Sequence, residues 1–450
     1  MKILVCVKVI KGELNPFDES ALECALQLSD DVTVISMGPK NCESVLKPLT
    51  RLGAKVILIS DNRFAGSDTL ATSYILSTAI KQMDYDLILC GRQSIDGDTA
   101  QVGPMLSQML KTSLMTNALK IQIKENKVFT VARTGEECAE LPALVTMERG
   151  YVLRFPSIFS KADDVKIIGN EILKCDLSKC GLTGSPTKVL EAFENERGKR
   201  KCKFVSMEEL FPLVDELMKQ NKAEAQKEYT GKKLKSVWVV GEEVLEKAKE
   251  ISDEVVFIEK LTPEEIAKKA LKEQPDVILW NADLWGRKNA PIVAAMLKTG
   301  LCADCTMLKT DGENLIMYRP AQGGNITAKI KCVTKPQMAT VRTKTESSDI
   351  IVSGGRGVAD KIEKLYELAE KLGAEVGTSR GLVDMNKMSY DKQIGLTGKT
   401  VSPKIYIAIG ISGAIHHTCA IEGSTTVIAI NPDKDARIFE YADYGVIKEF

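Results

Sequence analysis

The stretch Asp349-Ile-Ile-Val-Ser-Gly-Gly-Arg-Gly357 decides the fold class of the last part of the chain. Its first half is a short apolar run typical of a buried strand, glycines follow where that strand ends, and a helical pattern continues to Lys371. Further apolar runs at 405–409 and 426–430 indicate more strands, and Gly410-Ile-Ser-Gly-Ala414 follows the first of them. Strands that alternate with helices predict an α/β fold with a mostly parallel sheet.

The two glycine-rich turns also indicate where a ligand binds, because open α/β sheets bind ligands at the carboxyl ends of their strands. Backbone N–H groups of Ser353–Gly357 can approach an anion together with the start of the next helix, and Arg356 can add a charge-assisted contact. Two such loops in one domain suit a pyrophosphate. Each loop alone equally fits a plain strand-to-helix turn, because neither has the spacing G-x-G-x-x-G.

A similar alternation fills the first part of the chain. The apolar runs at 32–36, 56–60 and 87–90 predict strands, and the pattern at 68–82 predicts a helix between two of them. These runs therefore predict β-α-β units and another mostly parallel sheet.

The alternation restarts at Ser236-Val-Trp-Val-Val240 and repeats features of the first part. Asp86-Leu-Ile-Leu-Cys90 has its counterpart in Asp276-Val-Ile-Leu-Trp280, and Met109-Leu-Lys-Thr112 in Met296-Leu-Lys-Thr299. An internal duplication explains this repetition most simply. The alternative is a pair of unrelated α/β domains.

We therefore predict three α/β domains, two of them alike. Their expected bounds are 1–170, 236–345 and 346–450. The intervening residues 171–235 are rich in Lys and Glu and have weak strand signals, so we expect an arm and connector with one helix near 206–220.

The overall charge excludes some classes of function. The 450 residues carry 61 basic and 61 acidic side chains, so the formal net charge is zero. Without a long basic block, a nucleic-acid partner is not expected. The longest apolar runs, such as 405–411, are too short to span a bilayer, and the first residues lack a signal-peptide pattern. We expect no membrane insertion and a cytoplasmic location.

Twelve cysteines are scattered along the chain, several of them in predicted strands. This distribution favours free, buried thiols in a reducing compartment over a disulfide framework. Cys302 and Cys305 form a lone C-x-x-C, which has no second pair or nearby histidine. We therefore expect no metal site.

The histidines do not indicate hydrolytic chemistry. His416 and His417 are the only two, and no acidic partner or nucleophile elbow stands near them in sequence. The run Gln393–Thr400 contains Gly, Lys and Thr but lacks the spacing of a phosphate-binding P-loop. No catalytic residue is predicted.

Seven segments of the last domain resemble, in order and spacing, the FAD-binding signature of the electron-transfer flavoprotein alpha subunit. They are Ser353-Gly-Gly-Arg-Gly357, Gly377-Thr-Ser-Arg380, Val383-Asp384, Gln393-Ile-Gly-Leu-Thr-Gly-Lys-Thr-Val-Ser-Pro403, Gly410-Ile-Ser-Gly-Ala-Ile-His-His417, Ile430-Asn431 and Ala442-Asp-Tyr-Gly445. Leu396 departs from the pattern, because many relatives have a Gln there that can contact the flavin.

The resemblance covers nearly the whole chain. Residues 236–345 are similar to the alpha subunit's N-terminal domain, and residues 1–170 are similar to the beta subunit, so the two subunits would be fused in one chain, beta-like half first. The implied fold is α/β, with two similar adenine-nucleotide-hydrolase-like parallel-sheet domains plus a C-terminal FAD-binding Rossmann-like domain. The segments that carry the similarity are Arg319-Pro-Ala-Gln-Gly-Gly-Asn325, Pro336-Gln-Met-Ala-Thr-Val-Arg342, Val7-Lys8, Asn15-Pro16, Met37-Gly-Pro39 and Gly91-Arg-Gln-Ser-Ile-Asp-Gly-Asp-Thr-Ala-Gln-Val-Gly-Pro104.

The resemblance implies that FAD binds in the last domain. Arg356 and Ser379 would contact its phosphate and ribitol side, and Thr397 would hydrogen-bond near N5 of the flavin. Arg380 would lie against the ring, and His417 near O2. The complete implied set is Arg356, Ser379, Arg380, Gln393, Ile394, Gly395, Leu396, Thr397, Ser412, Gly413, Ala414, Ile415, His416, His417, Asn431 and Asp443.

The resemblance also implies a second nucleotide, in the N-terminal domain. Ordinary relatives hold AMP there, and electron-bifurcating relatives hold a second FAD that accepts hydride from NADH. Gly97–Pro104 and Gly184–Thr187 look more like the bifurcating group, whereas the loop between Lys8 and Asn15 is shorter than usual and would leave a flavin ring less covered. The implied residues are Cys6, Asn15, Pro16, Phe17, Asp18, Met37, Gly91, Asp96, Gly97, Asp98, Thr99, Ala100, Gln101 and Val102.

The implied function is electron transfer through FAD between an acyl-CoA dehydrogenase-like flavoenzyme and another redox partner. With a second FAD the protein would oxidise NADH and bifurcate its electrons, with ferredoxin as one acceptor. With AMP it would be a simple carrier. A third class, a nucleotide-binding regulatory protein without redox activity, would be colourless when purified.

Overall fold

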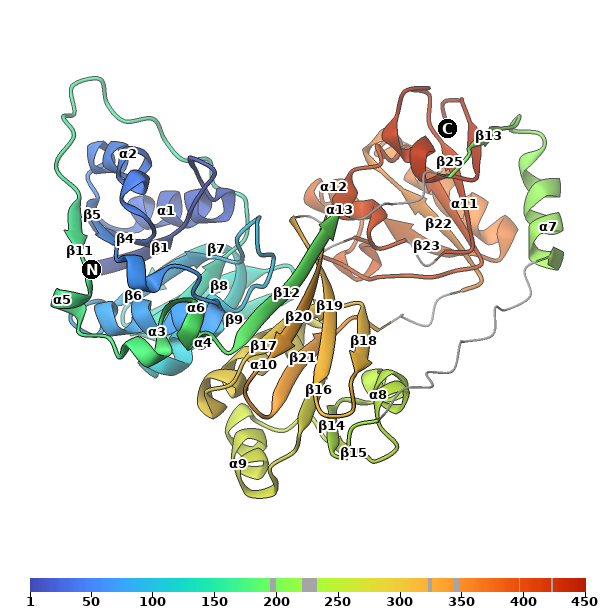
Figure 1. The fold of residues 1–450 in the computed structure, drawn as a ribbon. Coiled ribbons are helices and arrows are strands. Elements are labelled where there is room, and N and C mark those ends of the chain that lie inside the picture. Colours follow the sequence, from blue (N-terminus) through green and yellow to red (C-terminus); the bar gives the residue numbers. More distant parts are fainter. Residues whose placement is uncertain (195–199, 221–232, 323–325, 344–347, 396, 422–423) are drawn as a thin grey trace. The chain divides into compact units, whose positions relative to one another are not determined.

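A computed structural model of the chain describes residues 1–194, 200–220, 233–322, 326–343, 348–395, 397–421 and 424–450. The chain forms two compact units (Figure 1). Unit 1 comprises Met1–Ala192, Thr230–Gln322 and Ala328–Arg342. Unit 2 comprises Phe193–Tyr229, Gly323–Thr327 and Thr343–Phe450.

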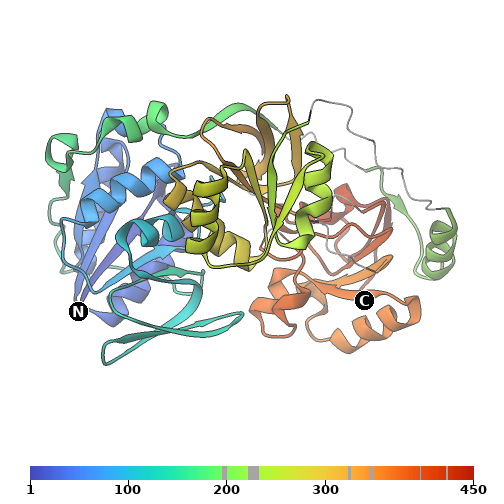
Figure 2. The ribbon, with the colours of Figure 1, turned by 90° about the horizontal axis from the view of Figure 1, so that it is seen from below.

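The first sheet of unit 1 has nine strands in the order β11-β5-β4-β1-β6-β10-β7-β8-β9. The strands from β11 to β7 run parallel, and β7, β8 and β9 are joined as an antiparallel meander (Figure 2). Their bounds are β1 (Lys2–Val7), β4 (Asp31–Met37), β5 (Lys55–Ile59), β6 (Leu87–Gly91), β7 (Ser113–Lys124), β8 (Lys127–Ala132), β9 (Gly135–Glu140), β10 (Ala143–Met147) and β11 (Lys166–Ile168).

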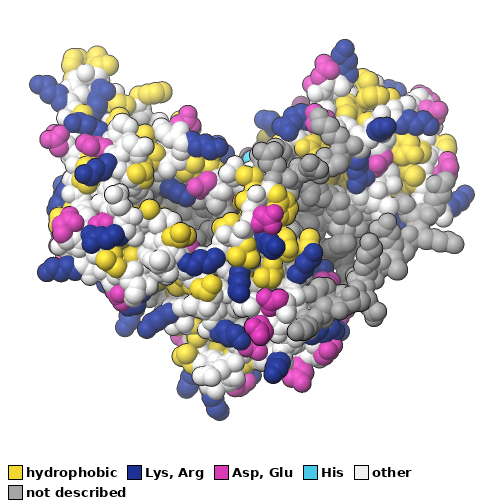
Figure 3. Space-filling view, in the orientation of Figure 1, with side chains coloured by type: hydrophobic (Ala, Val, Ile, Leu, Met, Phe, Trp, Pro, Cys, Tyr) yellow, Lys and Arg dark blue, Asp and Glu magenta, His cyan; other side chains and the backbone are white. Residues whose placement is uncertain are grey.

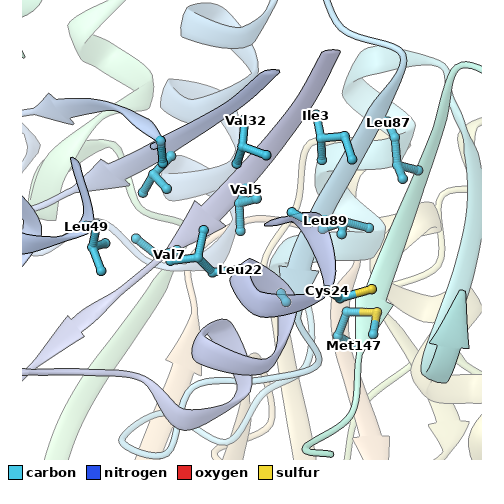
Figure 4. Packing of buried hydrophobic residues seen from close by; sticks show 14 of the residues in the cluster. Ile3, Val5, Val7, Leu22, Cys24, Val32, Leu49, Leu87, Leu89 and Met147 are labelled. Carbon is cyan, nitrogen blue, oxygen red and sulfur yellow. The ribbon is translucent and has the colours of Figure 1, made fainter. Parts of the chain in front are cut away.

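Strand β1 shows why this sheet carries helices on both faces. Its side chains alternate between two cores, because successive residues of a strand point to opposite faces. Ile3, Val5 and Val7 pack with Leu22 of helix α1 (Pro16–Leu28), as Figure 4 shows. On the other face, Leu4 and Cys6 pack with helices α3 (Thr69–Ile80) and α4 (Val102–Leu110).

The second parallel sheet of unit 1 repeats the topology of the first. Its order, β15-β14-β16-β21-β17, corresponds strand for strand to β4-β1-β6-β10-β7. This correspondence supports the internal duplication. The bounds are β14 (Val237–Val240), β15 (Val255–Ile258), β16 (Val277–Asn281), β17 (Leu301–Cys305) and β21 (Gln337–Val341), with helices α8 (Leu245–Ile251), α9 (Pro263–Glu273) and α10 (Leu284–Leu297).

Helices α4 and α10 join the two halves of unit 1 by packing against each other. Met105 of α4 is fully buried in the same core as Val293 and Ala294 of α10. A small sheet in the order β12-β20-β19-β18 completes the second half. It consists of β12 (Thr187–Glu194), β18 (Met307–Thr310), β19 (Leu315–Ala321) and β20 (Ile326–Cys332).

Unit 2 is built on a six-stranded parallel sheet in the order β13-β26-β25-β24-β22-β23. From β22 onward the order of strands is 2-1-3-4-5 along the chain, so the topology reverses between β22 and β24. The bounds are β13 (Lys203–Phe204), β22 (Ile350–Gly354), β23 (Glu375–Thr378), β24 (Ile405–Ile409), β25 (Thr426–Ile430) and β26 (Tyr444–Val446), with helices α7 (Leu210–Gln220), α11 (Ile362–Leu372), α12 (Arg380–Asp384) and α13 (Ile415–Thr418).

Two elements of unit 2 come from the segment expected to be a connector. Strand β13 pairs with β26 at the edge of the sheet, and helix α7 packs on the sheet near β24. Leu210, Val214 and Leu217 of α7 are buried in the same core as Val352 and Ile407.

The predicted fold class, α/β with parallel sheets, is confirmed. All twelve cysteines are free thiols, and most are buried. Among the described residues, no group of three or more His, Cys, Asp and Glu side chains could hold a metal ion. No helix in the described part of the chain has the length and apolar content required to cross a bilayer.

Candidate functional site

Two glycine-rich loops meet at the switch point of the sheet in unit 2. Gly355 donates its N–H to the carbonyl of Ile409 at 2.8 Å, and Gly357 donates to the carbonyl of Gly410 at 3.2 Å. Both loops follow the carboxyl ends of their strands, β22 and β24. Ligands bind at such switch points in open α/β sheets.

The close approach of these loops requires glycine. A Cβ on Gly355 would lie 2.3 Å from the carbonyl oxygen of Gly410, and one on Gly357 would lie 2.9 Å from the Cα of Gly410. Gly410 itself has a φ of 61°, in the left-handed region that favours glycine. The sequence therefore brings two strand-end loops together with little side-chain bulk, which suits an anionic pyrophosphate held by backbone N–H groups.

The end of strand β23 adds charged and polar groups to the same edge of the sheet. Ser379 and Arg380 begin the short helix α12, and Arg380 pairs with Asp384 at 3.1 Å. The side chain of Arg356 lies beside Gly381, because a Cβ on Gly381 would be 2.5 Å from the Cγ of Arg356. Two of the implied cofactor residues, Arg356 and Arg380, therefore converge at α12.

The loop that begins at Gln393 is held to the same edge by hydrogen bonds. Ile394 donates its N–H to the carbonyl of Thr378 at 2.8 Å, and Gln393 donates Nε2–H to Oγ1 of Thr397 at 2.8 Å. Gly395 has a φ of 150° and packs against the carbonyl of His416. Leu396 lies outside the described residues.

His417 is buried, and both of its ring nitrogens have protein partners. Nδ1 lies 3.0 Å from the carbonyl oxygen of Ile394, which can only accept, so Nδ1 carries the proton. Nε2 lies 2.9 Å from the hydroxyl of Tyr406 and accepts from it. Burial lowers the pKa of His417 to about 4, so the ring is neutral at physiological pH. His416, by contrast, is exposed.

The remaining implied FAD residues divide between the two edges of the sheet. Asn431 follows β25 at the carboxyl edge, and its Nδ2 donates to the carbonyl of Ile411 at 3.0 Å. This bond holds the loop that contains Ser412, Gly413 and Ala414. Asp443 is at the opposite edge, where it accepts from the N–H of Val427 and pairs with Arg200. Ile415 lies in helix α13.

A cavity of about 570 Å³ opens at the carboxyl ends of β1, β4, β5 and β6 in unit 1. This volume lies within the range of small-molecule sites, roughly 300–1,000 Å³. Ten of the residues implied for the second nucleotide line it: Cys6, Asn15, Asp18, Met37, Gly91, Gly97, Thr99, Ala100, Gln101 and Val102. The other four, Pro16, Phe17, Asp96 and Asp98, are not part of the lining.

The cavity also has a wall that the sequence analysis missed. Residues 59–69, apart from Arg63, line it after the end of strand β5, and Asp68 caps helix α3 by accepting from the N–H of Ala71 at 3.0 Å. The carboxyl-edge rule applied to the apolar run at 56–60 would have found this segment. The short connection between Lys8 and Asn15 forms a tight hairpin of β2 (Val9–Ile10) and β3 (Glu13–Leu14).

Asp18 is the buried carboxylate of this cavity. It accepts from the N–H of Lys8 at 2.7 Å and from the N–H of Gly91 at 3.0 Å. Burial raises the pKa of Asp18 to about 7, although these hydrogen bonds oppose the shift. Asp18 is therefore a group in the cavity whose charge changes near neutral pH.

This raised pKa predicts a pH-dependent stability. Because the folded chain holds the Asp18 proton up to about pH 7 while the unfolded chain releases it near pH 4, stability falls as pH rises between these values. The slope is at most about 1.4 kcal/mol per pH unit. Asp18→Asn removes the titration. We therefore expect the difference between the urea midpoints of the variant and the wild type to change in favour of the variant as pH rises from 5.5 to 7.5, and to stay at its new value at pH 8. A constant difference across this range would contradict the assignment.

Two family models match this chain. The family model described as "Electron transfer flavoprotein domain" matches residues 3–152 and 259–354, which is more than half of the chain. The model described as "Electron transfer flavoprotein FAD-binding domain" matches residues 344–422.

Individual relatives match about two fifths of the chain. The chain is 42% identical to the electron transfer flavoprotein subunit alpha of Thermoanaerobacterium thermosaccharolyticum, over 40% of this chain and 69% of that protein. It is 40% identical to the subunit alpha of Megasphaera elsdenii, over 39% of this chain and 67% of that protein. It is 36% identical to protein FixB of Rhizobium meliloti, over 40% of this chain and 64% of that protein.

Proposed function

Since the chain belongs to the electron transfer flavoprotein family, we propose that it carries electrons between redox proteins through an FAD at the carboxyl edge of the sheet in unit 2. The observation that carries this proposal is the junction of the two glycine-rich loops at the β22–β24 switch point, inside the range matched by the FAD-binding domain. The repeated strand order of unit 1 supports a beta-like half and an alpha-like half fused in one chain.

Residues of unit 2 would bind the pyrophosphate of FAD, stabilise the charge of the reduced flavin and position a loop beside it. Backbone N–H groups of Ser412–Ala414, in the loop that Gly355 and Gly357 hold in place, and the charge of Arg356 suit the pyrophosphate. Bound FAD would supply the redox chemistry that amino-acid side chains lack. Arg380 would favour the negative charge that develops during reduction, because a preorganised cation in a partly dry site stabilises such a charge. His417, neutral and bonded to Ile394 and Tyr406, would position the loop that begins at Gln393.

We further propose that the cavity in unit 1 holds the second nucleotide. Its glycine-rich wall at Gly97–Gly103 leads into helix α4, whose positive N-terminal end suits a phosphate. The resemblance of this wall to bifurcating relatives favours FAD, and with it NADH oxidation and electron bifurcation. A simple carrier with AMP in the cavity is the alternative.

Extraction of the purified full-length chain tests both proposals. We expect FAD on denaturation, and chromatography gives the number of nucleotides per chain. Two FAD per chain, together with flavin bleaching on anaerobic addition of NADH, would support the bifurcating form. One FAD with one AMP, and no bleaching, would support the simple carrier. FMN alone, or a colourless protein, would overturn the assignment of FAD.

A projecting loop of unit 1 suits the contact with a protein partner. Four large apolar side chains within 152–159 are almost fully exposed: Val152 is 87%, Phe155 95%, Ile158 85% and Phe159 88% exposed. In Figure 3, hydrophobic side chains gather at the tip of unit 1 where this loop runs, whereas charges of both signs are interspersed elsewhere on the visible face. A cluster of exposed apolar side chains typically marks a protein interaction site.

The backbone of this loop is held in place although its apolar side chains are not. Arg154 pairs with the carboxylate of Glu23 at 2.8 Å and also donates its backbone N–H to that carboxylate. Arg51 donates to the carbonyls of Ser157 and Ser160 at 3.0 and 3.1 Å. A loop fixed before binding loses less conformational entropy when a partner docks. We propose that the partner is an acyl-CoA dehydrogenase-like flavoenzyme.

A further inference from the structure

The wall of the cavity in unit 1 contains backbone that needs external support. Asp98 and Ala100 both have left-handed backbone, with φ of 50° and 54°. This conformation is unfavourable for most residues other than glycine, and for Ala100 in particular. Gly97, Thr99, Ala100 and Gln101 from this stretch line the cavity. Contacts elsewhere must therefore hold the loop 96–101 in its shape.

Some of those contacts come from the first half, where Lys8 pairs with Asp96 at 2.7 Å and Thr69 donates to Gln101 at 2.6 Å, and the others come from the second half of unit 1. Arg319 of strand β19 donates from Nη1 to the carbonyl of Gly97 at 2.7 Å and from Nη2 to the carbonyl of Asp98 at 3.2 Å. One guanidinium thus bridges two consecutive carbonyls, which its fixed fork of donors permits.

Two further hydrogen bonds join the same pair of segments. The N–H of Gln322 donates to the carbonyl of Asp96 at 3.3 Å, and Nε2 of Gln101 donates to the carbonyl of Leu301 at 3.0 Å. Both ends of the loop 96–101 are therefore attached to residues two hundred or more positions later in the chain.

Arg319 is itself fixed by its surroundings. Its side chain is buried, and the residue is only 5% exposed. The carboxylate of Asp304 lies near it and pairs with Arg287 at 3.0 Å and Arg342 at 3.1 Å. Burial alone would raise the pKa of Asp304, but Arg287, Arg342 and Arg319 lower it to about 2, so the carboxylate stays charged.

The bridge also orients a peptide group of the wall. The C=O and N–H of one trans peptide point in opposite directions. Because the carbonyl of Asp98 faces Arg319, the N–H of Thr99 lies on the other side of the loop, and Thr99 lines the cavity.

We propose that Arg319 is a positioning residue for nucleotide binding in unit 1. It fixes the loop 96–101 so that its backbone donors meet the phosphate of an adenine nucleotide. This inference rests on the proposed second nucleotide. Its consequence is that the site in the beta-like half is complete only with a residue of the alpha-like half.

Calorimetric titration of the full-length chain, freed of its nucleotide, with AMP and with adenosine tests the proposal. AMP is a suitable probe because it is also the adenylate part of FAD. For Arg319→Gln we expect AMP affinity to fall ten- to hundredfold and adenosine affinity to fall less than threefold, since only AMP has the phosphate. Arg319→Lys should recover part of the loss, because the ammonium group keeps the charge and can donate to a carbonyl but lacks the fixed fork of the guanidinium. Arg287→Lys is the matched control: it changes a cation beside the same Asp304, and AMP affinity should stay within twofold.

Amide hydrogen exchange gives a second readout, in which the 96–101 amides should exchange faster in Arg319→Lys than in Arg287→Lys. An equal loss of AMP and adenosine affinity in Arg319→Gln would show a merely structural role and overturn the proposal. Unchanged AMP affinity would overturn it as well. If the wild-type chain binds neither probe, the proposed second nucleotide is wrong, and the inference about Arg319 is wrong with it. If the wild-type chain binds AMP and Arg319→Gln binds it equally well, only the inference about Arg319 is wrong.

Discussion

Replacing Gly355 with alanine is expected to remove the flavin from the full-length chain. The new Cβ would lie 2.3 Å from the carbonyl oxygen of Gly410 and 2.8 Å from the Cα of Ile411, so the two loops must separate. Such overpacking costs about 1–3 kcal/mol and moves the backbone groups proposed to hold the pyrophosphate. We expect flavin retention to fall about tenfold or more, measured as the ratio of flavin to protein absorbance after gel filtration.

Gly373→Ala provides the matched control for this experiment. Gly373 ends helix α11 with a φ of 60°, and nothing lies within 4 Å of a Cβ added there. The substitution therefore introduces backbone strain of about 1 kcal/mol in the same domain without pushing the loops apart. The control should keep its flavin. If Gly355→Ala also keeps the wild-type ratio, the loop junction is not the cofactor site.

Substitution of both Phe155 and Phe159 by aspartate is expected to slow electron transfer from the partner by thirtyfold or more. Phe155 and Phe159 are 95% and 88% exposed, and hydrogen bonds hold the backbone of their loop in place. Aromatic side chains displayed in this way can insert into a partner's surface. Loss of an aromatic anchor costs about 2–4 kcal/mol of binding free energy, and a buried carboxylate adds to this. The rate of flavin reduction by an acyl-CoA dehydrogenase and its substrate, at low dehydrogenase concentration, measures the effect.

The flavin content of this double variant should not change, because neither ring is part of the proposed FAD site. Phe257→Asp makes the same kind of change on strand β15, where the ring is 45% exposed, and should transfer electrons at the wild-type rate. Equal rates for the double variant and Phe257→Asp would show that the loop does not dock the partner.

The sequence predicts well those parts of the structure that depend on residues close together in the sequence. The apolar run 350–354 and the glycines after it predict a strand and a close-approach turn, because both depend on local residue types. The rule that ligands bind at the carboxyl ends of parallel strands then brings Arg356, Ser379 and Asn431 to one edge. The same rule applied to the run at 56–60 would also have predicted the wall at 59–69.

The parts that the sequence does not predict depend on pairing between distant segments. Nothing near His417 shows that Tyr406 and Ile394 will occupy its ring nitrogens. Arg319 stands more than two hundred residues from the carbonyls that it bridges. Asp443 follows a glycine-poor segment near the end of the chain, and only the register of β25 and β26 places it at the edge away from the loops.

The contribution of β13 and α7 to unit 2 has a consequence during synthesis. Helix α7 leaves the ribosome long before the strands that cover it, since its apolar residues Leu210, Val214 and Leu217 pack with strands between Ile350 and Val446. At ribosomal rates of roughly 5–20 residues per second, this delay is on the order of 10–45 s. For that time the apolar residues of α7 have no strands to pack against. Chaperones that recognise exposed apolar segments have their target there, and a chain that stops between 220 and 350 would lack the strands that bury these residues.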